Sequence, residues 1–166
     1  MTKIIFSVLF CCFLAESLAC NKFKLNLRSV QNCAGDDAIV KVENGLRVTL
    51  TTECTIKVSG CADFKGFSTA TAHYVIKKGI LTVKRGSEDV CARLAELPAD
   101  LKAQGAPDKC PVAANRVCVS DYTIDISQYK QYLPLAKGRS FLDINVDHDT
   151  GKSCFRVEAD VTKSWF

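Results

Sequence analysis

The sequence predicts an all-β protein, an immunoglobulin-like antiparallel β-sandwich or cup with one short helix, held together by disulfides. Three observations lead to this class. Seven or so runs alternate apolar and polar residues with the two-residue period of a half-buried strand. Turn signals such as "ENG", "KKG" and "DHDTG" separate these runs, and the chain contains 10 cysteines.

The N-terminal residues 1–19 have the pattern of a secretory signal peptide. Lys3 precedes the apolar run "IIFSVLFCCFLA", and the small residues Ser17 and Ala19 occupy the positions that signal peptidase prefers. A membrane anchor is the alternative, but the run is shorter than the roughly 20 residues that span a bilayer. We therefore expect residues 20–166 to form a single secreted domain, and the lack of an N-glycosylation sequon favours the extracellular space over the lysosome.

Cysteine usage points to an oxidising compartment. Cys11 and Cys12 leave with the signal peptide, and an even set remains: Cys20, Cys33, Cys54, Cys61, Cys91, Cys110, Cys118 and Cys154. Four disulfides are expected, although the sequence alone does not determine their pairing. A zinc site is not expected, because no Cys-x-x-Cys pair is present and the histidines His73 and His148 are far apart in sequence. We predict neither a metal nor another cofactor.

The clearest strand signal covers residues 46–58, "LRVTLTTECTIKV", which alternates without interruption and predicts one long, half-buried strand. The same period recurs in residues 23–27, 70–76, 122–126 and 142–146. The last run with this period covers residues 151–161, and Cys154 falls on its polar face. A cysteine that points away from the core requires a structural reason.

One segment breaks the strand pattern. In "SEDVCARLAELPADL" Ser87 can cap a helix, Glu88 and Asp89 suit its positive end, and Pro98 ends it. We expect one short helix here, held by Cys91, followed by a loop from Pro98 to Pro107.

Residues 148–152 separate two alternating runs and predict a hairpin turn in which Gly151 takes a positive φ. The letters "GKS" at its end do not form a Walker A loop, because Val146 occupies the position of its first glycine. Calcium binding of the EF-hand type is also excluded, because Gly151 and Lys152 replace the required ligand and glycine.

The order of these features resembles the ML lipid-recognition domain family, and within it the ganglioside-activator branch. The stretches that carry the resemblance are "SVQNCAGDDAIVKVENGLRVTL", "CARLAELPADLKAQGAPDKCPVAANRVCVSDYTIDIS" and "YKQYLPLAKGRSFLDINVDHDTGKSCF". They cover residues 30–164 in order and spacing. By this resemblance Cys33 pairs with Cys154 and Cys91 pairs with Cys110, while three pairings stay open for Cys20, Cys54, Cys61 and Cys118. Residues 20–29 are expected to add an N-terminal strand.

The resemblance implies a secreted protein that binds and transfers lipid, holding fatty acyl chains, a sterol or a glycolipid between two splayed sheets. The side chains expected to line that space are Val48, Leu50, Ile56, Tyr74, Ile76, Leu81, Val83, Ile124, Ile126, Leu142, Ile144, Phe155 and Val157. The alternative is an ordinary sandwich in which the same side chains fill a core about 10 Å thick. Periodicity alone does not separate the two.

A rim that touches membranes is expected to surround the cavity. Aromatic and aliphatic side chains beside Lys130 and Lys137 suit the headgroup region of a bilayer. The expected rim residues are Phe64, Phe67, Tyr129, Tyr132, Leu133, Pro134 and Leu135. The formal charge of +4 is spread along the sequence without a cationic stripe that interleaves aromatics. Transient contact with a membrane surface is therefore expected, and nucleic-acid binding is not.

Two other functional classes agree less well with the sequence. Catalysis is not expected, because "GFSTA" lacks the Gly-x-Ser-x-Gly spacing of a nucleophile elbow and disulfides leave no free thiol. The runner-up to lipid binding is a secreted protein-recognition module with a filled core, which would bind a receptor or host factor through loops 60–68 and 127–138.

Overall fold

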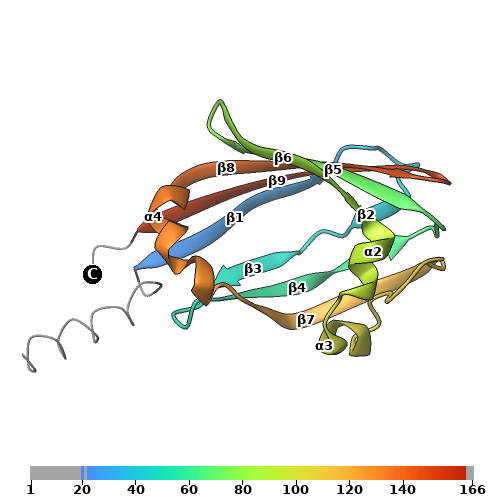
Figure 1. Ribbon diagram of the computed structural model, residues 1–166, viewed down its shortest axis with the longest axis horizontal. Helices are drawn as coiled ribbons and strands as arrows, with labels where there is room; N and C mark the ends of the chain where they lie inside the picture. The colour runs from blue at the N-terminus through green and yellow to red at the C-terminus, as the bar shows by residue number, and fades with distance from the viewer. Residues whose placement is uncertain (1–19, 21, 164–166) are drawn as a thin grey trace, which may run out of the picture.

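The computed structural model describes Cys20 and residues 22–163, so the expected signal peptide lies outside the described residues. Two antiparallel sheets make up this part of the chain (Figure 1). One sheet has the order β1-β9-β8-β5-β6; in the other, β2 and β3 pair with one side of β4, and β7 pairs with its other side. The strands are β1 (Phe23–Asn32), β2 (Val40–Val42), β3 (Arg47–Leu50), β4 (Thr55–Phe64), β5 (Ala70–Lys78), β6 (Leu81–Asp89), β7 (Asn115–Asp125), β8 (Gly138–His148) and β9 (Gly151–Lys163). The predicted β-sandwich class is confirmed.

The predicted single strand over residues 46–58 is wrong, because a turn at Thr51–Cys54 divides it into β3 and β4. The two strands pair as a hairpin, with Leu50 opposite Ile56. Cys54 takes a φ of +60° in this turn. A disulfide to Cys20 holds Cys54 there, with the two Cα atoms 5.3 Å apart. Alternation continues through the turn, so sequence periodicity did not reveal the reversal.

The helical region also differs from its prediction. Pairing with β5 extends β6 to Asp89, so Asp89 and not Ser87 caps the helix α2 (Val90–Ala95) by accepting a hydrogen bond from the Ala92 amide. The expected loop after Pro98 contains a second short helix, α3 (Ala99–Ala103). Proline fits immediately before a helix, because its fixed φ is compatible with the start and its missing N–H is not needed there.

All four disulfides form among the eight described cysteines. The Cys33–Cys154 and Cys91–Cys110 bonds implied by the family resemblance are both present. The remaining cysteines pair as Cys20–Cys54 and Cys61–Cys118, which selects one of the three open arrangements. Cys33–Cys154 joins the end of β1 to β9 and thereby explains the cysteine on the polar face of the last strand.

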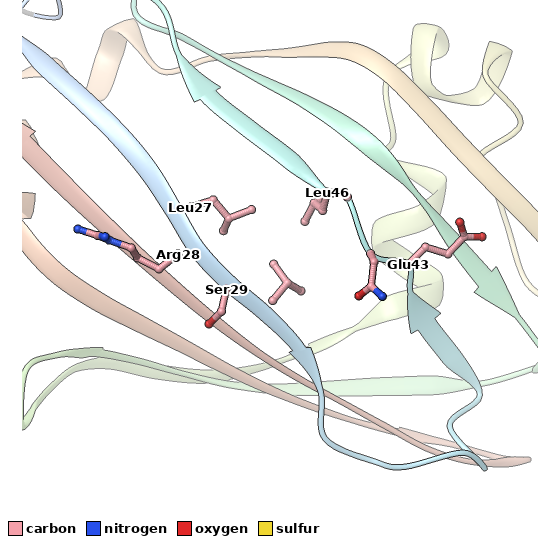
Figure 2. A pocket seen from close by; sticks show the side chains of 8 residues that line it. Leu27, Arg28, Ser29, Glu43 and Leu46 are labelled. Atoms are coloured by element: carbon pink, nitrogen blue, oxygen red, sulfur yellow. The ribbon is translucent and has the colours of Figure 1, made fainter.

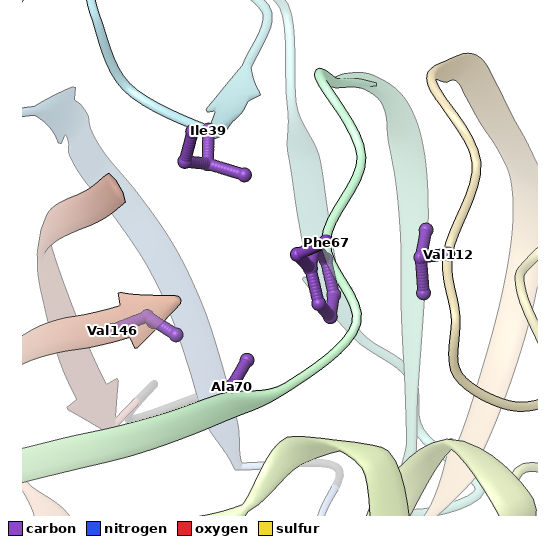
Figure 3. Packing of buried hydrophobic residues seen from close by; sticks show 5 residues of the cluster. All are labelled: Ile39, Phe67, Ala70, Val112 and Val146. Atoms are coloured by element: carbon purple, nitrogen blue, oxygen red, sulfur yellow. The ribbon is translucent and has the colours of Figure 1, made fainter. Parts of the chain in front are cut away.

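Buried side chains gather at the two ends of the sandwich. At one end Ile39, Phe67, Ala70, Val112 and Val146 form a cluster, and Figure 3 shows Phe67 between Val112 and the sheet residues Ala70 and Val146. The backbones of Phe67 and Val112 exchange two hydrogen bonds, which fix this ring in place. At the other end a second cluster contains Cys20, Phe23, Cys54 and Leu133. Leu133 belongs to α4 (Leu133–Ala136), which follows the 3₁₀ helix η2 (Ser127–Tyr132).

The predicted hairpin at residues 148–152 is confirmed between β8 and β9, and Gly151 has a φ of +149°. A buried polar group lies beside it. The hydroxyl of Ser153, which is 2% exposed, accepts a hydrogen bond from the Val40 amide and lies 2.9 Å from Nε2 of His148. The His148 ring packs against Phe67, with centroids 4.6 Å apart, and its Nδ1 has no hydrogen-bond partner among the described residues.

Because His148 is partly buried, we expect the free energy of unfolding to fall in mild acid. Burial lowers the pKa of His148 below its ordinary value of 6.5, and nearby Asp149 and Asp147 only partly oppose that effect. The unfolded chain therefore takes up the proton more readily. The stabilisation is complete above about pH 6.5 and is lost as the pH falls towards the lower folded-state pKa. Urea unfolding at stepped pH values is expected to show the midpoint decreasing across this window.

The matched substitutions are His148→Asn and His73→Asn, the second on a half-exposed side chain of β5. His148→Asn is expected to flatten the pH dependence between neutral pH and pH 5, and His73→Asn to preserve it. An unchanged slope in His148→Asn would contradict the assignment.

Candidate functional site

The two sheets approach each other along one side and separate towards the other. Strand β1 contacts β3 and β2 on the near side. In Figure 1 the sheets diverge from there towards β6 and β7, with α2 between them at one end and α4 at the other, while α3 lies beside β7. The side of the sandwich bounded by the edge strands β6 and β7 is called the mouth below.

The predicted lining residues other than Val83 belong to the inner faces but do not fill the space between them. Ile144 and Phe155 pack against the Ile39–Phe67 cluster, and Leu50 and Ile126 pack against the Cys20–Leu133 cluster. None of the thirteen predicted residues is buried. In a filled sandwich, facing side chains of central strands interdigitate and lose nearly all contact with solvent. The partial exposure of these apolar side chains therefore indicates an incompletely filled interior.

An apolar cavity of about 270 Å³ lies on the inner face of β4 and β7. Alternate residues of these strands point into it, and Ala62 lies opposite Val117 in the β4–β7 register. Leu97 and Pro107 close it from the α2–α3 segment. The complete lining is Val42, Leu46, Gly60, Cys61, Ala62, Phe64, Leu97, Ala106, Pro107, Val117 and Val119.

None of the thirteen predicted lining residues is among those that line this cavity, and Phe64 was expected at the rim instead. Gly60 and Ala62 continue the alternation of β4 beyond residue 58, so extension of that pattern could have found them. Val117 and Val119 could not be found by extending the pattern back from Tyr122. The pairing of β7 with β4 shifts between Val58 and Gly60, so odd-numbered residues of β7 face inward on one side of the shift and even-numbered residues on the other. A bulge shifts which residues face inward, and sequence period alone does not reveal its position.

A second space of about 170 Å³ lies at the seam between β1 and the β2–β3 connection. Figure 2 shows Leu27 and Leu46 pointing into the gap between these strands, with Arg28 and Glu43 at its edge. Leu46 also lines the larger cavity and lies directly against Gly60, where an added Cβ would come within 2.7 Å of its Cδ1. Leu46 therefore separates the two spaces.

The mouth side of β6 is more polar than predicted. Between Ile76 and Lys77 the register with β5 shifts, so that Lys84 pairs with Ile76 and Gly86 with Tyr74. This pairing places Lys84, and not Val83, on the same face as the inward Ile76. Lys84 Nζ lies 5.9 Å from the centre of the Tyr74 ring. Val83 is 64% exposed and Leu81 is 68% exposed, so both lie at the margin and not deep in the lining.

The structure buries some of the predicted rim residues and exposes others. Phe67 and Leu133 are buried in the two end clusters, and Phe64 packs against the first of them while lining the cavity. Tyr129, Tyr132, Pro134 and Leu135 are exposed, as predicted.

Across Cys20 and residues 22–163, no group of three His, Cys, Asp or Glu side chains is arranged to hold a metal ion. This part of the chain also contains no helix long and apolar enough to cross a membrane.

Comparison with known proteins identifies one close relative. No protein-family model matches the chain. It is 36% identical over 159 residues to sporozoite-associated mosquito saliva protein 1 of Anopheles gambiae, in an alignment that covers 91% of this chain and 88% of that protein. Among solved structures, chicken MD-1 complexed with lipid IVa aligns with a TM-score of 0.42 and 12% identity, covering 86% of this chain and 91% of MD-1.

Proposed function

The chain belongs to the family of sporozoite-associated mosquito saliva protein 1, and we propose that it is a secreted lipid-binding protein that holds an acyl chain, a sterol or a glycolipid between its sheets. Secretion is supported by four disulfides and by the salivary origin in the name of its relative. The Cys33–Cys154 and Cys91–Cys110 bonds also support the ML-type assignment, because that resemblance implied both.

The observation that carries this proposal is the unfilled apolar space between the inner faces. The larger cavity is lined by apolar side chains with Gly60, and its volume of about 270 Å³ is close to the lower end of the roughly 300–1,000 Å³ range of small-molecule sites. Burial of each methylene contributes about 0.8 kcal/mol, so ten methylenes would contribute on the order of 8 kcal/mol before ordering costs. Such binding needs neither a catalytic group nor a metal.

We further propose that the bound lipid enters and leaves through the mouth, which allows transfer between membranes. Tyr129, Tyr132 and Leu135 lie exposed at the η2–α4 end of this opening. Transfer of a labelled lipid between donor and acceptor vesicles tests this step separately from binding, since a receptor-like lipid binder would bind without transferring.

The direct test is to purify the disulfide-bonded protein from a secreting host, extract it with organic solvent and analyse the extract by mass spectrometry. A stoichiometric lipid, or saturable uptake of a fluorescent fatty acid by the delipidated protein, is the expected result. A preparation that is lipid-free and also fails to take up the fatty acid would overturn the proposal and favour the protein-recognition module.

A further inference from the structure

Exposed apolar side chains gather at the tip of the β5–β6 hairpin, which sequence analysis did not single out as a contact surface. Ile80 is 98% exposed, and Leu81 and Val83 follow it on the same hairpin. Figure 1 shows this hairpin projecting from the five-stranded sheet beyond its neighbour β8. Large apolar side chains grouped at a projecting tip are typical of an interaction site.

The second side of the same surface comes from η2 and α4. Leu135 is 70% exposed, and Tyr129 and Tyr132 are each 54% exposed. Lys78, the last residue of β5, donates a hydrogen bond from Nζ to the carbonyl oxygen of Leu135. The base of the hairpin and α4 therefore meet beside the mouth, and we call the hairpin tip together with η2 and α4 the docking end.

Positive charge is concentrated at this docking end. Residues 76–87 and 126–142 contain no Asp or Glu and contribute seven cations: Lys77, Lys78, Lys84, Arg85, Lys130, Lys137 and Arg139. The whole chain has a net charge of only +4, so the remainder is net negative. The cations that look evenly spread along the sequence are therefore brought together by the fold.

Carboxylates from adjacent strands neutralise only part of this charge. Asp143 lies 2.8 Å from Lys77, and Glu158 lies 3.2 Å from Arg139. Lys84, Arg85 and Lys137 form no ion pair with any described residue. Three cations thus stay available to an external anion beside exposed apolar and tyrosine side chains.

We propose that the docking end binds the surface of an anionic lipid bilayer, with Ile80 and Leu135 entering the interface and Lys84, Arg85 and Lys137 meeting lipid headgroups. Aliphatic tips insert at the acyl boundary, tyrosines prefer headgroup depth, and long cationic side chains reach phosphate or carboxylate groups from there. Each Lys or Arg near such a surface strengthens binding roughly fivefold. This proposal deepens the proposed lipid-binding function by specifying the membrane against which the mouth is placed.

Co-sedimentation of the disulfide-bonded protein with vesicles tests the proposal. Vesicles of phosphatidylcholine alone are compared with vesicles that also contain phosphatidylserine, at low and high salt. We expect binding to the anionic vesicles that weakens with salt. The variant Lys84→Glu/Arg85→Glu is expected to bind them at least tenfold more weakly, while Arg47→Glu/Lys57→Glu makes the same charge change on exposed residues of β3 and β4 and should bind normally.

The apolar contribution is tested by Ile80→Ser/Leu135→Ser, which alters two exposed side chains and is expected to weaken binding at least fivefold at every salt concentration. Equal binding to both vesicle types, or an equal loss in both charge variants, would overturn the proposal. A dimer that Ile80→Ser/Leu135→Ser converts to a monomer would identify a self-association surface instead. Fatty-acid uptake without vesicles reports on the cavity alone, so failure of docking and failure of lipid binding are distinguishable.

Discussion

Replacing both cysteines of the Cys33–Cys154 disulfide with alanine is expected to lower the free energy of unfolding by about 5 kcal/mol. The two residues are 121 positions apart, so this bond restricts nearly the whole unfolded domain. Loss of such a restriction raises the conformational entropy of the unfolded chain, and the cost grows with the logarithm of the loop length. Guanidinium unfolding without reductant measures the change.

Cys91→Ala/Cys110→Ala is the matched control for the disulfide prediction. That bond closes a separation of 19 positions, for which the same relation gives about 3 kcal/mol. The long-range variant is therefore expected to be less stable than the short-range one. Equal losses, or a larger loss in the control, would show that local packing around each bond outweighs chain entropy.

Filling the larger cavity with Ala62→Phe is expected to weaken fatty-acid binding by about a hundredfold while leaving the folded domain stable. Ala62 lines the cavity from near the end of β4, and a phenyl ring added there occupies space otherwise open to an acyl chain. Displacement of about four methylenes costs about 3 kcal/mol of binding free energy, which corresponds to a factor of a hundred or more. Titration with a fluorescent fatty acid measures the loss.

Two comparisons make the cavity prediction specific. Thr123→Phe adds the same ring at an exposed position of β7 and should leave fatty-acid binding unchanged. Thermal unfolding of Ala62→Phe separates a hollow interior from a filled one. In a filled core, overpacking costs about 1–3 kcal/mol, so marked destabilisation of this variant would contradict an open cavity.

Sequence period found most of the sheet but not its irregularities. The alternating runs correctly placed β1, β5, β8 and β9, because burial of one sheet face imposes a period of two on the sequence. The same alternation joined β3 to β4 across a turn that the Cys20–Cys54 bond helps to hold. It also assigned Val83 to the lining, since a shift of register on one strand changes which residues face inward without altering the composition.

The sequence by itself determined the class of this protein: an antiparallel β fold with four disulfides, in which apolar residues lie on one face of each strand. Only the tertiary structure decided whether side chains from the inner faces of the two sheets fill the space between them. The direction in which a side chain points is a local property of its strand. The distance between the sheets depends on how β1 meets β3 and on how α2 and α4 lie between the sheets at the two ends. Packing density and the gathering of cations at the docking end are properties of the assembled sheets, and no single stretch of sequence contains them.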